Sequence, residues 1–274
     1  MKEGVGSTQN RDRIAMAVTA LMLFGAQWFI GDFPLWFFAA PMNLLLGVLW
    51  LVALWEGYRH RERLSAVRYL LSAEATYVAL AVATVVAVVL GLQSEPASTS
   101  WPVVGGLLFV QSVLTLVILR GWRNERGVRW RFLVTHIGLW LAVTSALFGA
   151  PDKEILRVQV GENPTREAIS EQGEKRFLDY ELRLEKFDIE RSESGSPQQF
   201  CASVAVDKRV VTIEVNSPYS PRYGEEIYLV NYAAEGCVLQ IVREPWRGVT
   251  ATGVVMMLLG AVVLFLQGFS SEKR

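Results

Sequence analysis

Apolar runs separated by short polar links fill most of the chain up to residue 150, and one more run lies near its end. A helix needs about 20 predominantly apolar residues to cross the hydrocarbon core of a bilayer. The pattern therefore predicts a polytopic α-helical membrane protein with six transmembrane helices embedded in a lipid bilayer. The predicted helices cover residues 14–31, 36–55, 69–91, 103–119, 132–150 and 248–268.

Residues 151–245 follow a different pattern, in which apolar and polar residues alternate over short stretches. A period of two is typical of strands with one buried face. Turn signals such as Asn216-Ser217-Pro218 and Glu235-Gly236 separate the stretches. We expect a mainly antiparallel β domain, a small sandwich or barrel, inserted before the last helix, with a short helix over 164–173. The predicted strands cover 155–160, 180–185, 186–190, 200–206, 210–215, 226–232 and 238–243.

Basic residues are segregated along the 274-residue chain, although its net formal charge is zero. They occupy the N-terminal segment 1–13, the loops 56–63 and 120–131, and the tail 270–274, and are absent from the alternate links. Cytoplasmic loops carry the excess of Lys and Arg in membrane proteins. The pattern predicts cytoplasmic termini, a transmembrane region over 14–150 and 246–269, and an extracytoplasmic domain over 151–245. The neutral charge gives no reason to expect a nucleic acid partner.

His136 is one of only two histidines and lies inside a predicted transmembrane helix. An ionisable side chain in hydrocarbon is costly, so it is a candidate functional residue. A neutral imidazole can ligate a metal or a haem iron, and a low dielectric favours the neutral form. The alternative is a structural histidine that reaches the interface or bonds a neighbouring helix. The predicted helices hold no second histidine, so bis-histidine haem ligation requires a partner subunit or a homodimer.

Two further residues are candidates by position. Trp140 lies four residues beyond His136 on the same helical face. It either flanks a flat macrocycle or packs against another helix. Glu74 lies at a depth similar to that of His136, where it either orients the imidazole or is an interfacial carboxylate near Arg68.

Other polar residues have simpler interpretations. His60 lies in a basic loop and is expected to be solvated, and Gln111 is expected to bridge two helices. Cys201 and Cys237 both fall outside the predicted helices. In an oxidising compartment the two thiols could form a disulfide, but their spacing alone does not establish one. The sequence holds no Walker A loop, Cys-x-x-Cys-His, dinucleotide fingerprint or His-Glu-x-x-His. Since residues 151–245 lack histidine, a histidine-based triad there is excluded.

Several short segments resemble the ResB-like family of system II cytochrome c biogenesis, and they occur in that family's order of transmembrane helix, outer domain and transmembrane helix. Together they extend over about residues 132–268. The segments are Thr135–Trp140, Phe148–Asp152, Leu184–Glu190, Gly195–Pro197, Ile213–Pro218 and Leu239–Pro245.

The resemblance implies a membrane subunit of a cytochrome c haem lyase in the bacterial inner membrane. Such a subunit works with a CcsA-like membrane protein, helps to export haem b from the cytoplasmic side and delivers it to apocytochrome c outside. His136 matches the family's transmembrane histidine, a haem axial ligand, and the chain would be a non-autonomous part of the synthase. The alternative from another class is a non-enzymatic scaffold or sensor whose outer β domain binds a ligand or partner protein.

Overall fold

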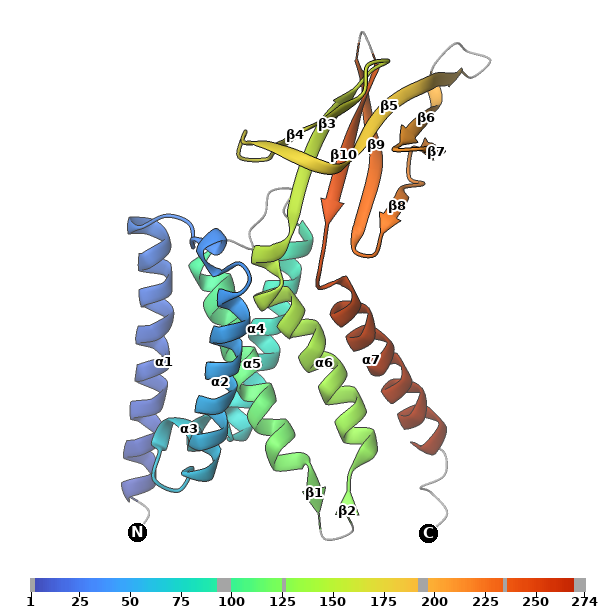
Figure 1. Ribbon diagram of the computed structural model, residues 1–274. Helices are drawn as coiled ribbons and strands as arrows, with labels where there is room; N and C mark the ends of the chain where they lie inside the picture. The colour runs from blue at the N-terminus through green and yellow to red at the C-terminus, as the bar shows by residue number, and fades with distance from the viewer. Residues whose placement is uncertain (1–2, 93–99, 125–126, 192–196, 234–235, 269–274) are drawn as a thin grey trace. The chain divides into compact units, whose positions relative to one another are not determined.

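A computed structural model describes residues 3–92, 100–124, 127–191, 197–233 and 236–268. The chain divides into two compact units, one of residues 1–151 with 249–274 and the other of residues 152–248. The first unit is helical and the second consists of β-strands (Figure 1). The predicted tail 270–274, Glu235 of a predicted turn, and Gly195 and Ser196 of a family-like segment lie outside the described residues.

The helical unit contains a helix at each predicted transmembrane position, with altered boundaries. The second helix begins at Met42 rather than at residue 36, because Pro34 and Pro41 bracket a short 3-10 turn that precedes it. The third predicted helix is split in two at Leu71 and Ser72. The elements are α1 (Glu3–Phe29), η1 (Leu35–Phe38), α2 (Met42–Arg59), α3 (Ser65–Leu70), α4 (Ala73–Leu92), α5 (Trp101–Gly121), the β1–β2 hairpin (Arg123–Asn124, Gly127–Val128), α6 (Trp130–Phe148) and α7 (Arg247–Gly268).

Four of these helices, α4, α5, α6 and α7, are long and apolar enough to cross a membrane. The protein is therefore a membrane protein by the length and composition of its helices. The prediction of six transmembrane helices is not confirmed. Among the described residues, α1 has Asp12 and Arg13 within its length and α2 has Asn43 and Glu56, and such residues lower the mean hydropathy of both helices.

Helix α5 lies at the centre of the helical unit and contacts α1, α2, α3, α4 and α6. Its buried residues are mainly valine and leucine, as expected for a helix that is apolar on every side. Ala75 and Ala79 of α4 pack against Val110 and Val113 of α5. Small alanine side chains allow the two helices to approach closely.

The outer unit is one eight-stranded antiparallel sheet with the strand order β7-β6-β5-β4-β3-β10-β9-β8. Its core consists of alternate residues from most of the strands, including Leu156, Leu182, Val204, Ile227 and Leu239. The strands are β3 (Glu154–Val160), β4 (Thr165–Ser170), β5 (Lys175–Arg191), β6 (Pro197–Val206), β7 (Arg209–Glu214), β8 (Tyr219–Arg222), β9 (Glu225–Ala233) and β10 (Gly236–Arg243).

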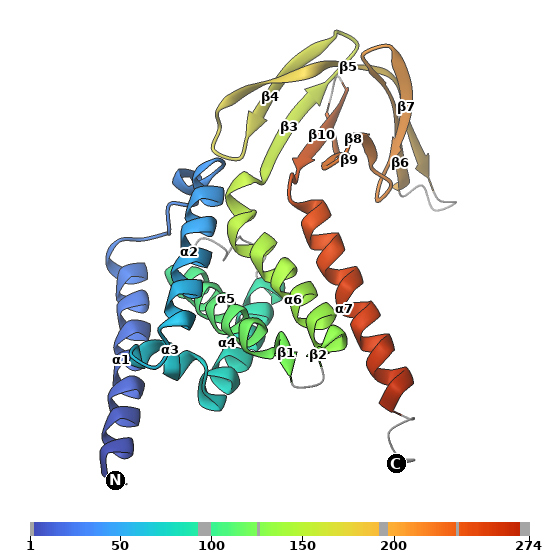
Figure 2. The same cartoon turned by 60° about the horizontal axis from the view of Figure 1, so that its bottom comes forward.

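The long strand β5 bends this sheet. Its first half pairs with β4 and its second half with β6, and Leu182 pairs with both Thr165 and Val206. The bend brings β7 into contact with β8 and β9 from the opposite edge, as Figure 2 shows. The domain is thus a single sheet folded over its own core, neither a two-sheet sandwich nor a barrel closed by a continuous ladder.

The predicted short helix over 164–173 is wrong. Residues 165–170 form strand β4, and Gly173 has a positive φ of 80° in the turn that leads to β5. The sequence Thr165-Arg-Glu-Ala-Ile-Ser170 contains good helix formers. Pairing with β3 and β5 on either side outweighs that weak local preference.

Candidate functional site

His136 lies six residues after Trp130, the first residue of α6, which is about 9 Å along the axis at about 1.5 Å per residue. Its side chain is partly buried. The imidazole Nδ1 lies 2.8 Å from the backbone carbonyl oxygen of Phe132, one turn earlier. The ring stacks on the Phe132 ring, with centroids 4.0 Å apart and planes 28° apart.

This contact decides the tautomer of the imidazole. A carbonyl oxygen can only accept a hydrogen bond, so Nδ1 must carry the proton and donate it. In the neutral ring, Nε2 then holds the lone pair. A hydrogen bond from one ring nitrogen to a carbonyl commonly orients a histidine whose other nitrogen ligates a metal. In the neutral tautomer with the proton on Nδ1, His136 could ligate a metal through Nε2.

The Phe132 ring that supports His136 is itself held from two directions. The Arg129 guanidinium lies over the Phe132 ring, with its central carbon 5.0 Å from the ring centroid. Gly121, at the end of α5, leaves room for the ring, because a Cβ there would lie 2.2 Å from Phe132 Cε1. No motif in the sequence marks Phe132 or Gly121. Only the i−4 position of Phe132 relative to the histidine was available as a signal.

Trp140 packs between α6 and α5. Its indole Nε1 donates to Thr115 Oγ1 at 2.9 Å, and Thr115 in turn donates to the Gln111 carbonyl oxygen at 2.7 Å. Gln111 Nε2 donates to Thr144 Oγ1 at 2.6 Å, so Gln111 bridges the two helices as expected. The indole also joins the apolar cluster around Leu133. These contacts match the packing interpretation of Trp140, and its role beside a macrocycle stays a prediction.

Glu74 is bound by Arg13 of α1. Arg13 Nε and Nη2 donate to its two carboxylate oxygens at 2.7 Å and 3.3 Å. Among the described contacts of His136, none involves Glu74. A role of Glu74 toward the imidazole stays a prediction. His60 is exposed just after α2 and lies 3.9 Å from Glu56, as expected for a solvated residue.

Helix α7 crosses α6 on a face next to His136, and glycines make the close approach possible. A Cβ on Gly138 would lie 2.7 Å from the Gly253 carbonyl oxygen, and a Cβ on Gly260 would lie 2.1 Å from Thr135 Oγ1. Thr250 Oγ1 donates to Ser145 Oγ at 2.8 Å in the same interface. Small residues and interhelical hydroxyl bonds are the usual means of packing transmembrane helices.

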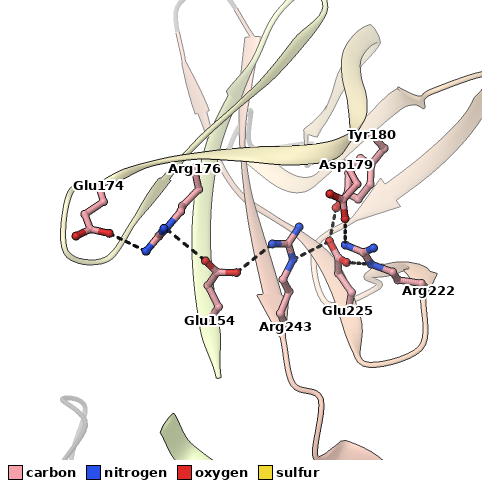
Figure 3. Close-up of polar contacts among 8 residues, drawn as sticks. All are labelled: Glu154, Glu174, Arg176, Asp179, Tyr180, Arg222, Glu225 and Arg243. Atoms are coloured by element: carbon pink, nitrogen blue, oxygen red, sulfur yellow. Dashed lines mark hydrogen bonds and ion pairs between the residues drawn. The ribbon is translucent and has the colours of Figure 1, made fainter. Parts of the chain in front are cut away.

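The outer unit contains a buried charged network that the sequence did not reveal (Figure 3). Glu225 is 2% exposed, accepts a hydrogen bond from Tyr180 Oη at 2.6 Å, and pairs with Arg222 and Arg243. Burial and the adjacent Glu225 carboxylate raise the pKa of Tyr180 well above its usual range. Glu154 extends the network from Arg243 Nη1 at 3.0 Å. Glu225 sits at a strand start in a polar stretch, and its burial depends on the tertiary fold.

Cys201 and Cys237 are not joined by a disulfide in the structure. Cys201 lies on β6 and is partly buried, whereas Cys237 lies on β10 and is fully buried. Burial raises the pKa of the Cys237 thiol to about 11. Their pairing stays a prediction. Within the described ranges, no group of three His, Cys, Asp or Glu side chains could hold a metal ion.

Comparison with protein families identifies one match, over residues 124–238, to the model of the ResB-like family. This stretch is similar to that family. It includes His136, Trp140 and most of the β unit, so the ResB-like resemblance seen in the sequence is confirmed there. No curated protein matches the chain at a significant level.

One similar solved structure is "Cytochrome c Heme Lyase CcmF", with 13% sequence identity and a TM-score of 0.38. The alignment covers 68% of this chain and 33% of that chain. The chain thus spans about a third of the length of that structure.

Proposed function

We propose that this protein acts in cytochrome c biogenesis as a membrane subunit of a cytochrome c haem lyase. In this role it receives haem from the cytoplasmic side and passes it outward for covalent attachment to apocytochrome c. The observation that carries the proposal is the state of His136. Its Nδ1 is engaged by the Phe132 carbonyl, so Nε2 offers its lone pair within the ResB-like segment of a helix apolar enough to span a bilayer.

The residues around His136 fit a haem axial ligand. The bond to Phe132 fixes the plane of the imidazole ring, as outer partners of metal-bound histidines do. The Phe132 stack restricts rotation of the ring, and Gly121 provides the space in which that stack forms. A neutral imidazole bound to the haem iron would keep the haem at this site, and prevent its loss into the lipid, until the haem is transferred.

His136 supplies one axial ligand, and a partner supplies the other. The second histidine of this chain, His60, is exposed and lies beside Glu56, outside the apolar helices. In our proposal a CcsA-like membrane protein completes the site and carries out the attachment of haem. The present chain is then a non-autonomous subunit of the synthase in the bacterial inner membrane.

The proposal also orients the chain. Both termini and the basic loops lie in the cytoplasm, α1 and α2 join the four apolar helices in the membrane, and the β unit lies outside. His136 then lies toward the cytoplasmic side of α6, where haem enters. The outer β unit is placed where apocytochrome c is found.

The test is cytochrome c maturation in a host that lacks its own maturation system, with this chain and a CcsA-like protein coexpressed. Covalent haem on a reporter cytochrome is measured by haem staining. We expect holocytochrome with the wild-type pair and a loss of at least about tenfold with His136→Ala. The matched control is His60→Ala, which removes the only other histidine and should leave maturation unchanged.

Two results would count against the proposal. One is wild-type maturation with His136→Ala, and the other is maturation that does not depend on this chain. Either result would favour the alternative of a membrane scaffold or sensor. Immunoblotting of both subunits in membranes ensures that a loss of activity is not a loss of protein.

A further inference from the structure

A cleft of about 630 Å³ opens in the outer β unit, well away in sequence from His136. It is lined by four cations from separate elements, namely Arg166 of β4, Lys208 and Arg209 at the β6–β7 turn, and Arg222 of β8. Two carboxylates, Glu181 and Asp207, also line it. A concavity of this size is typical of small-molecule sites.

The carboxylates of the cleft are already engaged. Asp207 Oδ1 accepts a hydrogen bond from the Glu181 backbone N–H at 2.9 Å, and the Asp207 N–H donates to the Glu181 carbonyl oxygen at 2.8 Å. These reciprocal bonds fasten the β6–β7 turn to β5. The Glu181 side chain lies 3.8 Å from Arg166. The turn that carries Lys208 and Arg209 is therefore held in place at the cleft.

Lys208 and Arg209 remain as the unbalanced charges. Neither side chain forms an ion pair or a hydrogen bond with any described residue, although the Arg209 backbone pairs with Val206 in the sheet. Most other cations of the described part of this unit do have a carboxylate within 4 Å, including Lys153, Lys175 and Lys186. Two adjacent cations without a carboxylate partner, on a fixed turn beside a cleft, favour an anionic ligand.

Two of the lining residues, Tyr180 and Arg222, are held by the buried Glu225. Glu225 holds both Tyr180, through its hydroxyl, and Arg222, which also binds Asp179 Oδ2 at 2.9 Å (Figure 3). The aromatic rings of Tyr180 and Tyr219 and the apolar side chains of Val206 and Pro221 complete the lining. Cations beside aromatic and apolar surface suit a ligand that combines negative charge with a flat apolar body.

We propose that this cleft binds a small amphipathic anion, a molecule with an apolar or aromatic body and at least two carboxylate or phosphate charges. Lys208 and Arg209 bind the anionic groups, and Tyr180, Tyr219 and Arg222 form the wall against which the body lies. The proposal does not depend on haem lyase activity, because none of these residues takes part in the site around His136.

The test uses the full chain purified in detergent and 2,6-naphthalenedicarboxylate, a fluorescent aromatic dianion whose charge keeps it out of micelles. Fluorescence anisotropy should show saturable binding that weakens as salt is raised. The double variant Lys208→Gln/Arg209→Gln should weaken binding about tenfold or more, because it removes both cations that bind the anionic groups. The matched control is Lys175→Gln/Arg157→Gln, which removes one Lys and one Arg from exposed strand positions outside the cleft and should bind like wild type.

Two competitors resolve the chemistry. 1-Naphthyl phosphate tests whether a phosphate group can replace the carboxylates. Pyrophosphate tests whether negative charge alone, without an aromatic body, is enough for binding. The proposal expects pyrophosphate to compete much more weakly than the aromatic anions. Absence of saturable binding, equal loss in the control variant, or displacement only by an acidic peptide would overturn it. Circular dichroism and the melting temperature of both double variants confirm that each is folded.

Discussion

His136 donates its Nδ1 proton to the carbonyl oxygen of Phe132 at 2.8 Å and stacks on the ring of the same residue. One residue thus sets both the tautomer and the orientation of the imidazole. The bond needs no second side chain, because its acceptor is the backbone carbonyl of residue i−4, which is present in every helix. What the sequence adds is the aromatic ring at that position and the glycine that accommodates it.

Gly121→Ala should disturb this arrangement from the neighbouring helix. The new Cβ would lie 2.2 Å from Phe132 Cε1, so the ring has to move away from its position beneath His136. Alanine is otherwise favourable in a helix by about 1 kcal/mol relative to glycine, so the protein should remain folded. We expect haem retained by the purified complex to fall several-fold. Gly47→Ala is the control, because its Cβ would meet Phe148 at an ordinary 3.7 Å. Equal haem contents in the two variants would show that the Phe132 ring does not position His136.

Gly138→Ala should separate α6 from α7. Here the added Cβ would lie 2.7 Å from a backbone oxygen, that of Gly253, and backbone cannot move aside as a side chain can. Overpacking of this kind typically costs about 1–3 kcal/mol. The measurement is thermal unfolding in detergent, with Gly47→Ala again as the control. A melting temperature equal to that of the wild type would mean that the two helices do not pack through these glycines.

The buried Tyr180–Glu225 pair predicts a pH dependence at the alkaline end. Because the pKa of Tyr180 is raised in the folded state, its contribution to stability is complete below the ordinary tyrosine pKa of about 10 and is lost as pH rises above that value. Unfolding monitored between pH 8 and 11 should show a steeper alkaline loss of stability for the wild type than for Tyr180→Phe. Parallel pH profiles would contradict the assignment.

Removal of the charge at Glu225 should destabilise the outer unit. Glu225→Gln keeps the side-chain shape but leaves Arg243, which is 22% exposed, without its buried anion. Breaking a buried ion pair from one side typically costs about 3–5 kcal/mol. Urea unfolding followed by the fluorescence of Trp246, in a variant with the other tryptophans replaced, reports on this unit. Exposed Glu167→Gln should change stability little.

The two cysteines should differ in reactivity. Since burial raises the pKa of Cys237 to about 11, almost none of it is thiolate at pH 8. Iodoacetamide should therefore modify Cys201 in the native protein and reach Cys237 only after unfolding. Mass spectrometry of the alkylated peptides gives the answer. If neither cysteine is modified until a reductant is added, they are paired in the protein as isolated.

The sequence predicted the positions of the helices and most strands because their signals are periodic and local. The apolar runs marked α4 to α7, and alternation marked β3 and β10, in which Leu156 and Leu239 face the core. Strand β4 was missed because its residues prefer helix and only its neighbours make it a strand. The bend in β5 was also missed because it depends on neighbouring strands. Leu182 pairs with β4 on one side and with β6 on the other.

The candidate site was predictable in part. A lone histidine within an apolar run identified His136 directly, because the cost of burying it requires a reason. The partner of Glu74 was not predictable, since Arg13 lies 61 residues away and Arg68 is nearer in sequence. The outer cleft was also missed, because Arg166, Lys208 and Arg222 come together only through the folding of the sheet.

The most direct test of the central claim is the visible absorption spectrum of this chain purified with a coexpressed CcsA-like protein, the partner we propose. It is recorded for the wild type and for His136→Ala with and without added imidazole. We predict a haem Soret band in the wild type, its loss in the variant while both subunits still copurify, and partial recovery with imidazole. An unchanged Soret band in His136→Ala would show that Nε2 of His136 does not ligate haem.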